Sequence, residues 1–95
     1  MPETIGKIRN IKLGSFLQDT VNAFDIGTVT LRETATGADW VFYLWNSRAD
    51  APTLQRVLQT QRLALAREAA FRKLVVHLWH EIDSSLVDEM QVDIP

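Results

Sequence analysis

The stretch from Val75 to Asp83, VVHLWHEID, decides which of two folds this chain adopts. No Gly, Pro, Asn or Asp lies between Thr53 and Ile82, so the stretch can continue the helix that the preceding residues favour. Its composition indicates the opposite, because LVVHLW is richer in strand-forming residues than anything in the preceding segment. A helical spacing of apolar residues nevertheless runs through it, at Val75, Val76, Trp79, Ile82, Leu86 and Met90.

The residues around this stretch favour a strand. The run VVHLW resembles the earlier run VFYLW, which ends at Trp45 and is the most strand-like segment of the chain. Downstream, Met90, Val92 and Ile94 alternate with polar residues, which is the pattern of a half-buried strand. Residues 83–85, DSS, supply a turn between the two strands. We therefore predict a β-hairpin here rather than a continued helix.

One helix is predicted upstream, from Thr53 to about Arg72. Residues 46–52, NSRADAP, break the preceding strand, and a proline at their end suits the first turn of a helix. Apolar residues at spacings of three and four form one stripe along this helix: Leu54, Val57, Leu58, Leu65 and Ala69. Leu63 and Phe71 fall outside the stripe, which indicates that the helix is contacted on more than one side.

Three strands are predicted before the helix. Residues 5–13 form the first, with imperfect alternation, and residues 26–34 form the second, with better alternation. Residues 40–45, WVFYLW, form the third, and the Thr36-Gly37 turn makes the second and third strands a hairpin. Residues 15–18, SFLQ, match a capping box, so a short helical turn is expected after the first strand.

The predicted order is strand, strand, strand, helix, strand, strand, which defines a small α+β domain over residues 1–95. This order resembles the OB-fold, a five-stranded Greek-key barrel with a helix between its third and fourth strands. The resemblance covers the order of elements alone and rests on no motif. An open antiparallel sheet covered by one long helix fits the same pattern.

Composition excludes several classes of protein. The 95 residues contain no cysteine, so disulfides, thiolate metal sites and cysteine nucleophiles are absent. A hydrophobic content of 46% and a charged content of 23% are ordinary for a globular domain. No apolar run reaches the roughly 20 residues of a membrane helix. We therefore expect a cytoplasmic protein without a membrane partner.

Charge is unevenly distributed along the chain. Residues 48–73 contain six basic and two acidic residues, whereas residues 81–95 contain five acids and no Lys or Arg. The ordinary interpretation is a solvated helix face followed by a solvated strand. The alternative is a basic surface that binds an anionic partner.

Histidine provides the only metal-like cluster, at His77 and His80 with Glu81 and Asp83 nearby. Zinc needs three or four ligands that converge on one point. Two residues at an odd offset point to opposite faces of a strand, so the predicted hairpin separates the two imidazoles. We expect one partly packed histidine and one at the solvent edge, and no metal.

Catalytic motifs are missing from the sequence. It contains no G-x-S-x-G elbow, no Walker loop and no G-x-G-x-x-G, and its four glycines are scattered singly. The acid pair Asp88-Glu89 lies in an acidic, solvated segment, where nothing separates the two pKa values as acid–base catalysis requires. We expect neither an enzyme nor a bound cofactor.

Aromatic residues give the best indication of function. Alternation places Trp40, Phe42 and Leu44 on one face of the third strand, and Val41, Tyr43 and Trp45 on the other. Both faces are apolar, so a helix can cover one and something else must cover the other. A closed barrel or a second subunit would do so. An open face would let bases stack beside the basic residues Lys7, Arg9, Lys12 and Arg32.

Two functional hypotheses follow. The first is a non-catalytic interaction module that forms homo-oligomers, or binds a protein partner, through an apolar sheet face or the long helix. The second is an OB-like module that binds single-stranded nucleic acid, with Tyr43, Trp45 and Trp79 stacking on bases. In that hypothesis the phosphates are held by Arg48, Arg56, Arg62 and Arg67. The net charge of −2 weighs against the second hypothesis.

Overall fold

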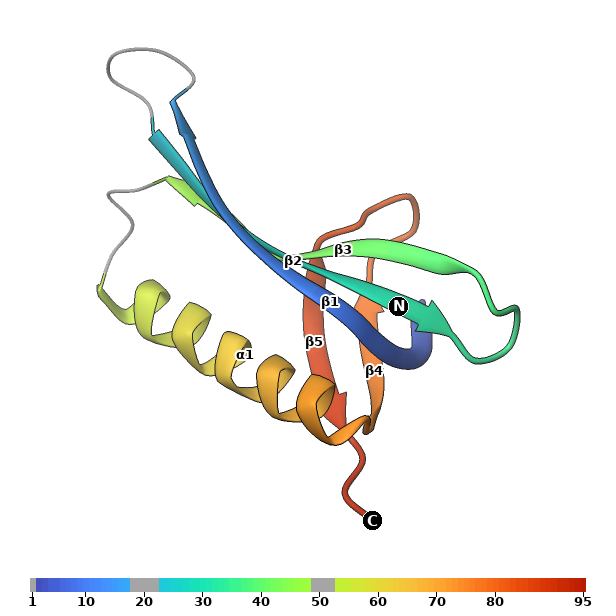
Figure 1. The fold of residues 1–95 in the computed structure, drawn as a ribbon. Coiled ribbons are helices and arrows are strands. Elements are labelled where there is room, and N and C mark those ends of the chain that lie inside the picture. Colours follow the sequence, from blue (N-terminus) through green and yellow to red (C-terminus); the bar gives the residue numbers. More distant parts are fainter. Residues whose placement is uncertain (1, 18–22, 49–52) are drawn as a thin grey trace.

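The computed structural model of the chain describes residues 2–17, 23–48 and 53–95 (Figure 1). Its elements are β1 (Glu3–Leu17), β2 (Ala23–Glu33), β3 (Asp39–Arg48), α1 (Thr53–Arg72), β4 (Val75–His80) and β5 (Val87–Val92). The order of elements predicted from the sequence is therefore confirmed. The turn predicted at Thr36-Gly37 joins β2 and β3, and Gly37 adopts a left-handed φ of 74° there.

The stretch VVHLWH is strand β4, and the alternative of a continued helix is excluded. Helix α1 ends at Arg72, and Lys73 adopts a left-handed φ of 55°. The amide of Leu74 then donates to the carbonyl oxygen of Ala69 at 2.9 Å, which closes the last turn. The chain leaves the helix at this point, and β4 pairs antiparallel with both β1 and β5.

The five strands form one sheet in the order β3-β2-β1-β4-β5, with every neighbouring pair antiparallel. The long strand β1 pairs with β4 through its first third, from Glu3 to Lys7, and with β2 through most of its length, and it curves as it passes between them (Figure 1). An isolated parallel bridge between Tyr43 and Leu86 brings β3 against the start of β5. The two outer strands therefore meet, and the sheet forms a partly closed barrel.

The core lies inside this curved sheet, under α1. Alternate residues of the strands supply it, as the pleat requires, and α1 contributes two alanines that allow close approach. The buried residues are Ile8, Val29, Leu31, Phe42, Leu44, Ala66, Ala69, Leu74, Val76, Leu78 and Val87. Helix α1 packs against β1, β3 and β5.

The apolar stripe predicted on α1 is not the packing face of the helix. Only Ala69 of its five residues is buried, and the other four are exposed: Leu54, Val57, Leu58 and Leu65. The helix instead packs through a face rotated toward Ala66 and Ala69, with Leu63 half-buried beside them. Small residues are buried because α1 lies close to the sheet, and the larger leucines remain outside.

Two further expectations about the strands are corrected. Residues 15–17 continue β1 and pair with β2, so the helical turn expected from the capping box is wrong over these residues; Gln18 lies outside the described residues. Simple alternation along β3 fails at a bulge opposite Gly27 and Thr28. That bulge adds one residue, so Trp45 packs against the core with Leu44 instead of facing outward with Tyr43.

Candidate binding surfaces

The two histidines lie on opposite faces of β4 and do not form a common site. His77 lies between two carboxylates, with Nδ1 2.9 Å from Glu3 and Nε2 2.8 Å from Asp93. His80 contacts Thr4 at 3.0 Å, and its ring lies 5.1 Å from that of Phe42. Within residues 2–17, 23–48 and 53–95, no group of three His, Cys, Asp or Glu residues could hold a metal ion.

His77 and its acids tie the two ends of the chain together. Hydrogen bonds to Asp93 and then to Glu3 raise the pKa of His77 above its ordinary value of 6.5, and the bond from His77 lowers the pKa of Asp93. The ring of Trp79 stacks on that of His77, with centroids 5.8 Å apart. Trp79 therefore packs on a neighbouring side chain and is only half-buried.

Arg62 is engaged inside the fold. Its guanidinium donates three hydrogen bonds, to the carbonyl oxygens of Leu44 at 2.8 Å, Val87 at 3.0 Å and Asp88 at 3.1 Å. These carbonyls belong to β3 and β5, the strands that meet at a single bridge. Because both terminal nitrogens of its guanidinium already donate to backbone carbonyls, Arg62 is poorly placed to hold a phosphate.

The remaining arginines and aromatics proposed from the sequence are scattered. Arg67 is exposed on α1, and the side chains of Arg48 and Arg56 lie outside the described part of the structure. Tyr43 is half-buried on the outer side of β3, opposite Thr28. Trp45 packs against the core, where its Nε1 is buried without a hydrogen-bond partner among the described residues. The members of this set whose side chains are described therefore do not form one surface.

The first surface that the structure does assemble is the α1 stripe, which we define as Leu54, Val57, Leu58 and Leu65. Leu58 and Leu65 line a groove of about 390 Å³ between α1 and β5. The opposite wall is formed by Asp88, Glu89 and Met90 of β5. This groove therefore combines an apolar helical wall with an acidic strand.

The second surface is the outer side of β1 and β2, named here the basic face: Lys7, Arg9, Lys12 and Arg32. All four side chains are exposed, and the adjacent residues Ile8 of β1 and Leu31 of β2 are buried in the core. Arg32 pairs with Asp39 at 3.0 Å, and this hydrogen bond lowers the pKa of Asp39. The three cations of β1 form no ion pair with the described residues. The sequence predicts these four residues beside an open face. In the structure Lys7 lies opposite Arg32, whereas Lys12 lies further along β1, opposite Thr28.

The third surface is a groove of about 380 Å³, named here the Trp40 groove. It lies where the end of the β2–β3 hairpin faces the β4–β5 turn, and it is lined by Thr4, Glu33, Trp40, Val41, Phe42, His80, Asp83, Ser84 and Ser85. Sequence reasoning assigned Trp40 to a packed strand face. The sequence does contain a signal for this contact: Glu33 and Trp40 flank the predicted turn, so a hairpin brings them together.

Comparisons with known proteins give no further assignment. No family model matches the chain, and no curated protein or solved structure matches it. Within the described residues, no helix combines the length and the apolar composition needed to cross a membrane. Any function must therefore be argued from the three surfaces.

Proposed function

We propose that this chain is a non-catalytic interaction module that self-associates through the α1 stripe. The main support for this proposal is the exposure of the stripe: Leu54 is 71% exposed and Leu58 is 50% exposed. Large contiguous apolar patches on soluble domains usually mark contact surfaces. A helix of 20 residues, about 30 Å long at 1.5 Å per residue, presents enough length for a helix–helix contact.

A second copy of the chain fits this surface by charge as well as by shape. The strand beside the stripe is acidic at Asp88 and Glu89, whereas Arg72 lies two helical turns after Leu65, on the same side of α1. In a two-fold pair with antiparallel helices that cross near Leu65, Arg72 of each copy approaches the acidic strand of the other. Such an isologous contact closes on itself and buries both stripes.

Analytical ultracentrifugation tests this proposal, over concentrations from about 10 µM to about 500 µM, a range suited to weak association. We expect a reversible monomer–dimer equilibrium that Leu58→Glu abolishes. Phe71→Glu is the matched control, because Phe71 is 89% exposed on another side of α1, beside Arg67. Circular dichroism verifies that both variants fold. A wild-type chain that stays monomeric throughout would overturn the proposal.

The basic face favours a second candidate, an OB-like module that binds single-stranded nucleic acid. The helix between β3 and β4 and the contact between β3 and β5 support the OB-like description, and that fold binds oligonucleotides across its second and third strands. The exposed cations Lys7, Arg9 and Lys12 border this region. Tyr43 on β3 would supply the stacking ring.

Fluorescence anisotropy with a labelled oligonucleotide tests this candidate. We expect binding that weakens with salt at a log–log slope of about −0.7 per phosphate contacted. Lys7→Glu together with Lys12→Glu should remove binding, whereas Arg67→Glu, at another exposed cation on α1, should keep most of it. Equal losses in both variants would show that net charge alone, and no defined face, is responsible.

A further inference from the structure

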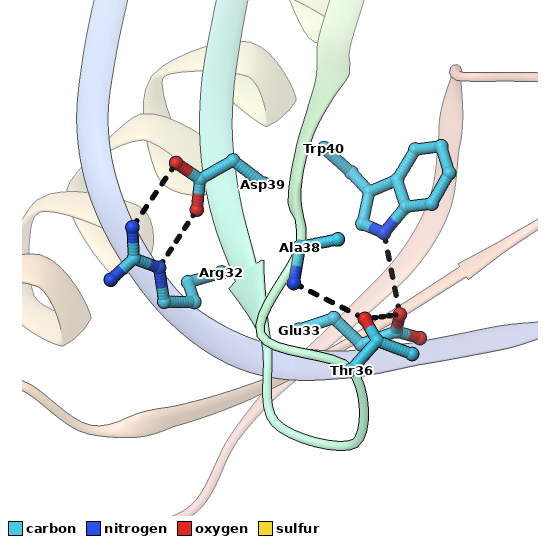
Figure 2. Close-up of polar contacts among 6 residues, drawn as sticks. All are labelled: Arg32, Glu33, Thr36, Ala38, Asp39 and Trp40. Atoms are coloured by element: carbon cyan, nitrogen blue, oxygen red, sulfur yellow. Dashed lines mark hydrogen bonds and ion pairs between the residues drawn. The ribbon is translucent and has the colours of Figure 1, made fainter.

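The Trp40 groove is preorganised by a hydrogen-bond network that Figure 2 shows. The indole Nε1 of Trp40 donates to Oε1 of Glu33 at 3.3 Å, and the hydroxyl of Thr36 donates to the same oxygen at 2.6 Å. The amide of Ala38 in turn donates to that hydroxyl oxygen at 3.2 Å. The network fixes an aromatic ring and a carboxylate next to each other at the end of the hairpin.

The network leaves recognition groups available. Trp40 is 52% exposed although its indole nitrogen is tied down, so much of its ring is open to a ligand. Both hydrogen bonds to the Glu33 carboxylate end on Oε1, and Oε2 accepts none from the described part of the chain. A fixed aromatic ring beside a carboxylate with one oxygen open to a ligand suits a cationic group. Such a group can contact the ring with its planar or alkyl part and donate N–H hydrogen bonds to the carboxylate.

The charge of the groove has one sign. Glu33 and Asp83 line it, and none of its described lining residues is Lys or Arg. Arg32, the nearest basic residue in sequence, lies on the opposite side of the hairpin, where it pairs with Asp39 (Figure 2). His80 is occupied, because Nδ1 contacts the carbonyl oxygen of Glu81 at 3.0 Å and Nε2 contacts Thr4.

We propose that the Trp40 groove binds an organic cation, a guanidinium or an alkylammonium group. The cation lies over the ring of Trp40 and donates to Oε2 of Glu33, while Phe42 forms an apolar floor. Cation–π contact and a charge-assisted hydrogen bond act on the same group, which explains why an acid and an exposed tryptophan are held together. The site is separate from the α1 stripe and from the basic face.

Proton–nitrogen correlation spectra of the labelled protein test this site. The probes are N-acetyl-arginine amide and its uncharged isostere, N-acetyl-citrulline amide. We expect a saturable shift of the Trp40 indole signal with the arginine probe and little shift with the citrulline probe. Equal shifts with both probes, or no saturable shift with either, would overturn the proposal.

Two variants and one control assign the binding to named residues. Trp40→Leu and Glu33→Gln should each weaken binding of the arginine probe by about tenfold, the equivalent of 1.4 kcal/mol. Glu33→Gln retains the oxygen that accepts from Trp40 and Thr36, so the fold is kept and only the charge is lost. Trp79→Phe, a tryptophan outside the groove, should bind as the wild type does. Unchanged affinity in Glu33→Gln would contradict the assignment.

A further comparison distinguishes two sources of the cation, an arginine of another protein and a free small molecule. Methylguanidine carries the shared chemistry without a peptide backbone. If N-acetyl-arginine amide and a short arginine-containing peptide bind progressively more tightly than methylguanidine, the groove receives an arginine of another protein. If all three bind equally, the groove receives a free small cation.

Discussion

Nη1 of Arg62 lies 2.8 Å from the carbonyl oxygen of Leu44, and the same nitrogen donates to the carbonyl oxygen of Val87 at 3.0 Å. Leu44 belongs to β3 and Val87 to β5, and the bridge between Tyr43 and Leu86 brings these strands together. The guanidinium therefore links α1 to both strands next to this bridge, through hydrogen bonds to their carbonyl oxygens.

Replacing Arg62 should therefore destabilise the whole domain. Arg62→Met keeps most of the side-chain length but removes the part-buried hydrogen bonds to the carbonyl oxygens of Leu44 and Val87. We expect a loss of about 3 kcal/mol in the free energy of unfolding, measured by urea denaturation. Arg67→Met, at an exposed position on the same helix, should change stability by less than about 0.5 kcal/mol. Equal effects of the two substitutions would contradict the role of Arg62 in closing the barrel.

Gly27 of β2 makes room for the ring of Trp45, its partner on β3. A Cβ atom added at Gly27 would lie 2.6 Å from Cη2 of Trp45, closer than van der Waals contact allows. Gly27→Ala should cost about 2 kcal/mol of stability by overpacking. Gly14→Ala is the control, because its added Cβ would meet its nearest neighbour, Cγ1 of Ile26, at 3.5 Å.

A double-mutant cycle checks the cause of that loss. In a Trp45→Leu background the ring is absent, so Gly27→Ala should cost clearly less than it does in the wild type. Thermal unfolding of the four proteins gives the coupling. Costs that simply add would show that backbone conformation at Gly27, and not Trp45, sets the requirement for glycine.

The elements could be predicted from the sequence because their signals are local. The β-branched and aromatic residues of VVHLWH predict a strand, even though no helix-breaking residue separates them from α1. Val76 and Leu78 alternate into the core from β4, which is a strand pattern. Helix α1 was recognised from its composition and from the break that precedes it.

The surfaces could not be predicted because they depend on contacts distant in sequence. Periodicity correctly placed Ala69 on the packing face of α1. It did not show that Ala66 would be buried while the four larger residues of the stripe stay exposed, since that choice depends on how closely the helix approaches the sheet. The sequence predicts that Arg62 holds a phosphate. It does not reveal the carbonyl acceptors of Arg62, because these lie 18 and 25 residues away along the chain. The bulge that turns Trp45 inward also depends on the facing strand.

Lys73 occupies a conformation that favours glycine. With φ at 55°, it is the left-handed residue that ends α1, and its amide donates to the carbonyl oxygen of Ala70 at 3.3 Å. Lys73→Gly should raise the free energy of unfolding by about 1 kcal/mol, because the strain of the left-handed backbone disappears. Lys73→Ala keeps the strain and should give no such gain in thermal unfolding. A gain of similar size in both variants would assign the effect to the lost charge.

His77 makes stability depend on pH. Both ring nitrogens face carboxylates, and both can donate only when the ring is protonated. The hydrogen bonds to Asp93 and Glu3 raise the pKa of His77 in the folded protein above its ordinary value of 6.5, which applies in the unfolded chain. The contribution of His77 to stability is therefore fully present below the unfolded pKa. It is lost as pH rises through the higher pKa of the folded state. The lowered pKa of Asp93 keeps that carboxylate charged in this range, and its own contribution is lost only as pH falls through that lowered value, below 3.8.

The protein should therefore become more stable between about pH 8.5 and about pH 5.5, as protonation of His77 completes both bonds. His77→Gln should flatten this dependence, which urea midpoints at the two pH values would reveal. His80→Gln is the control, because the His80 ring contacts Thr4 and a backbone carbonyl and no carboxylate in the described residues. The effect should also shrink in high salt, since the acids are partly exposed. A wild-type midpoint that is equal at both values, or that rises toward alkaline pH, would mean that the two carboxylates do not hold a charged His77.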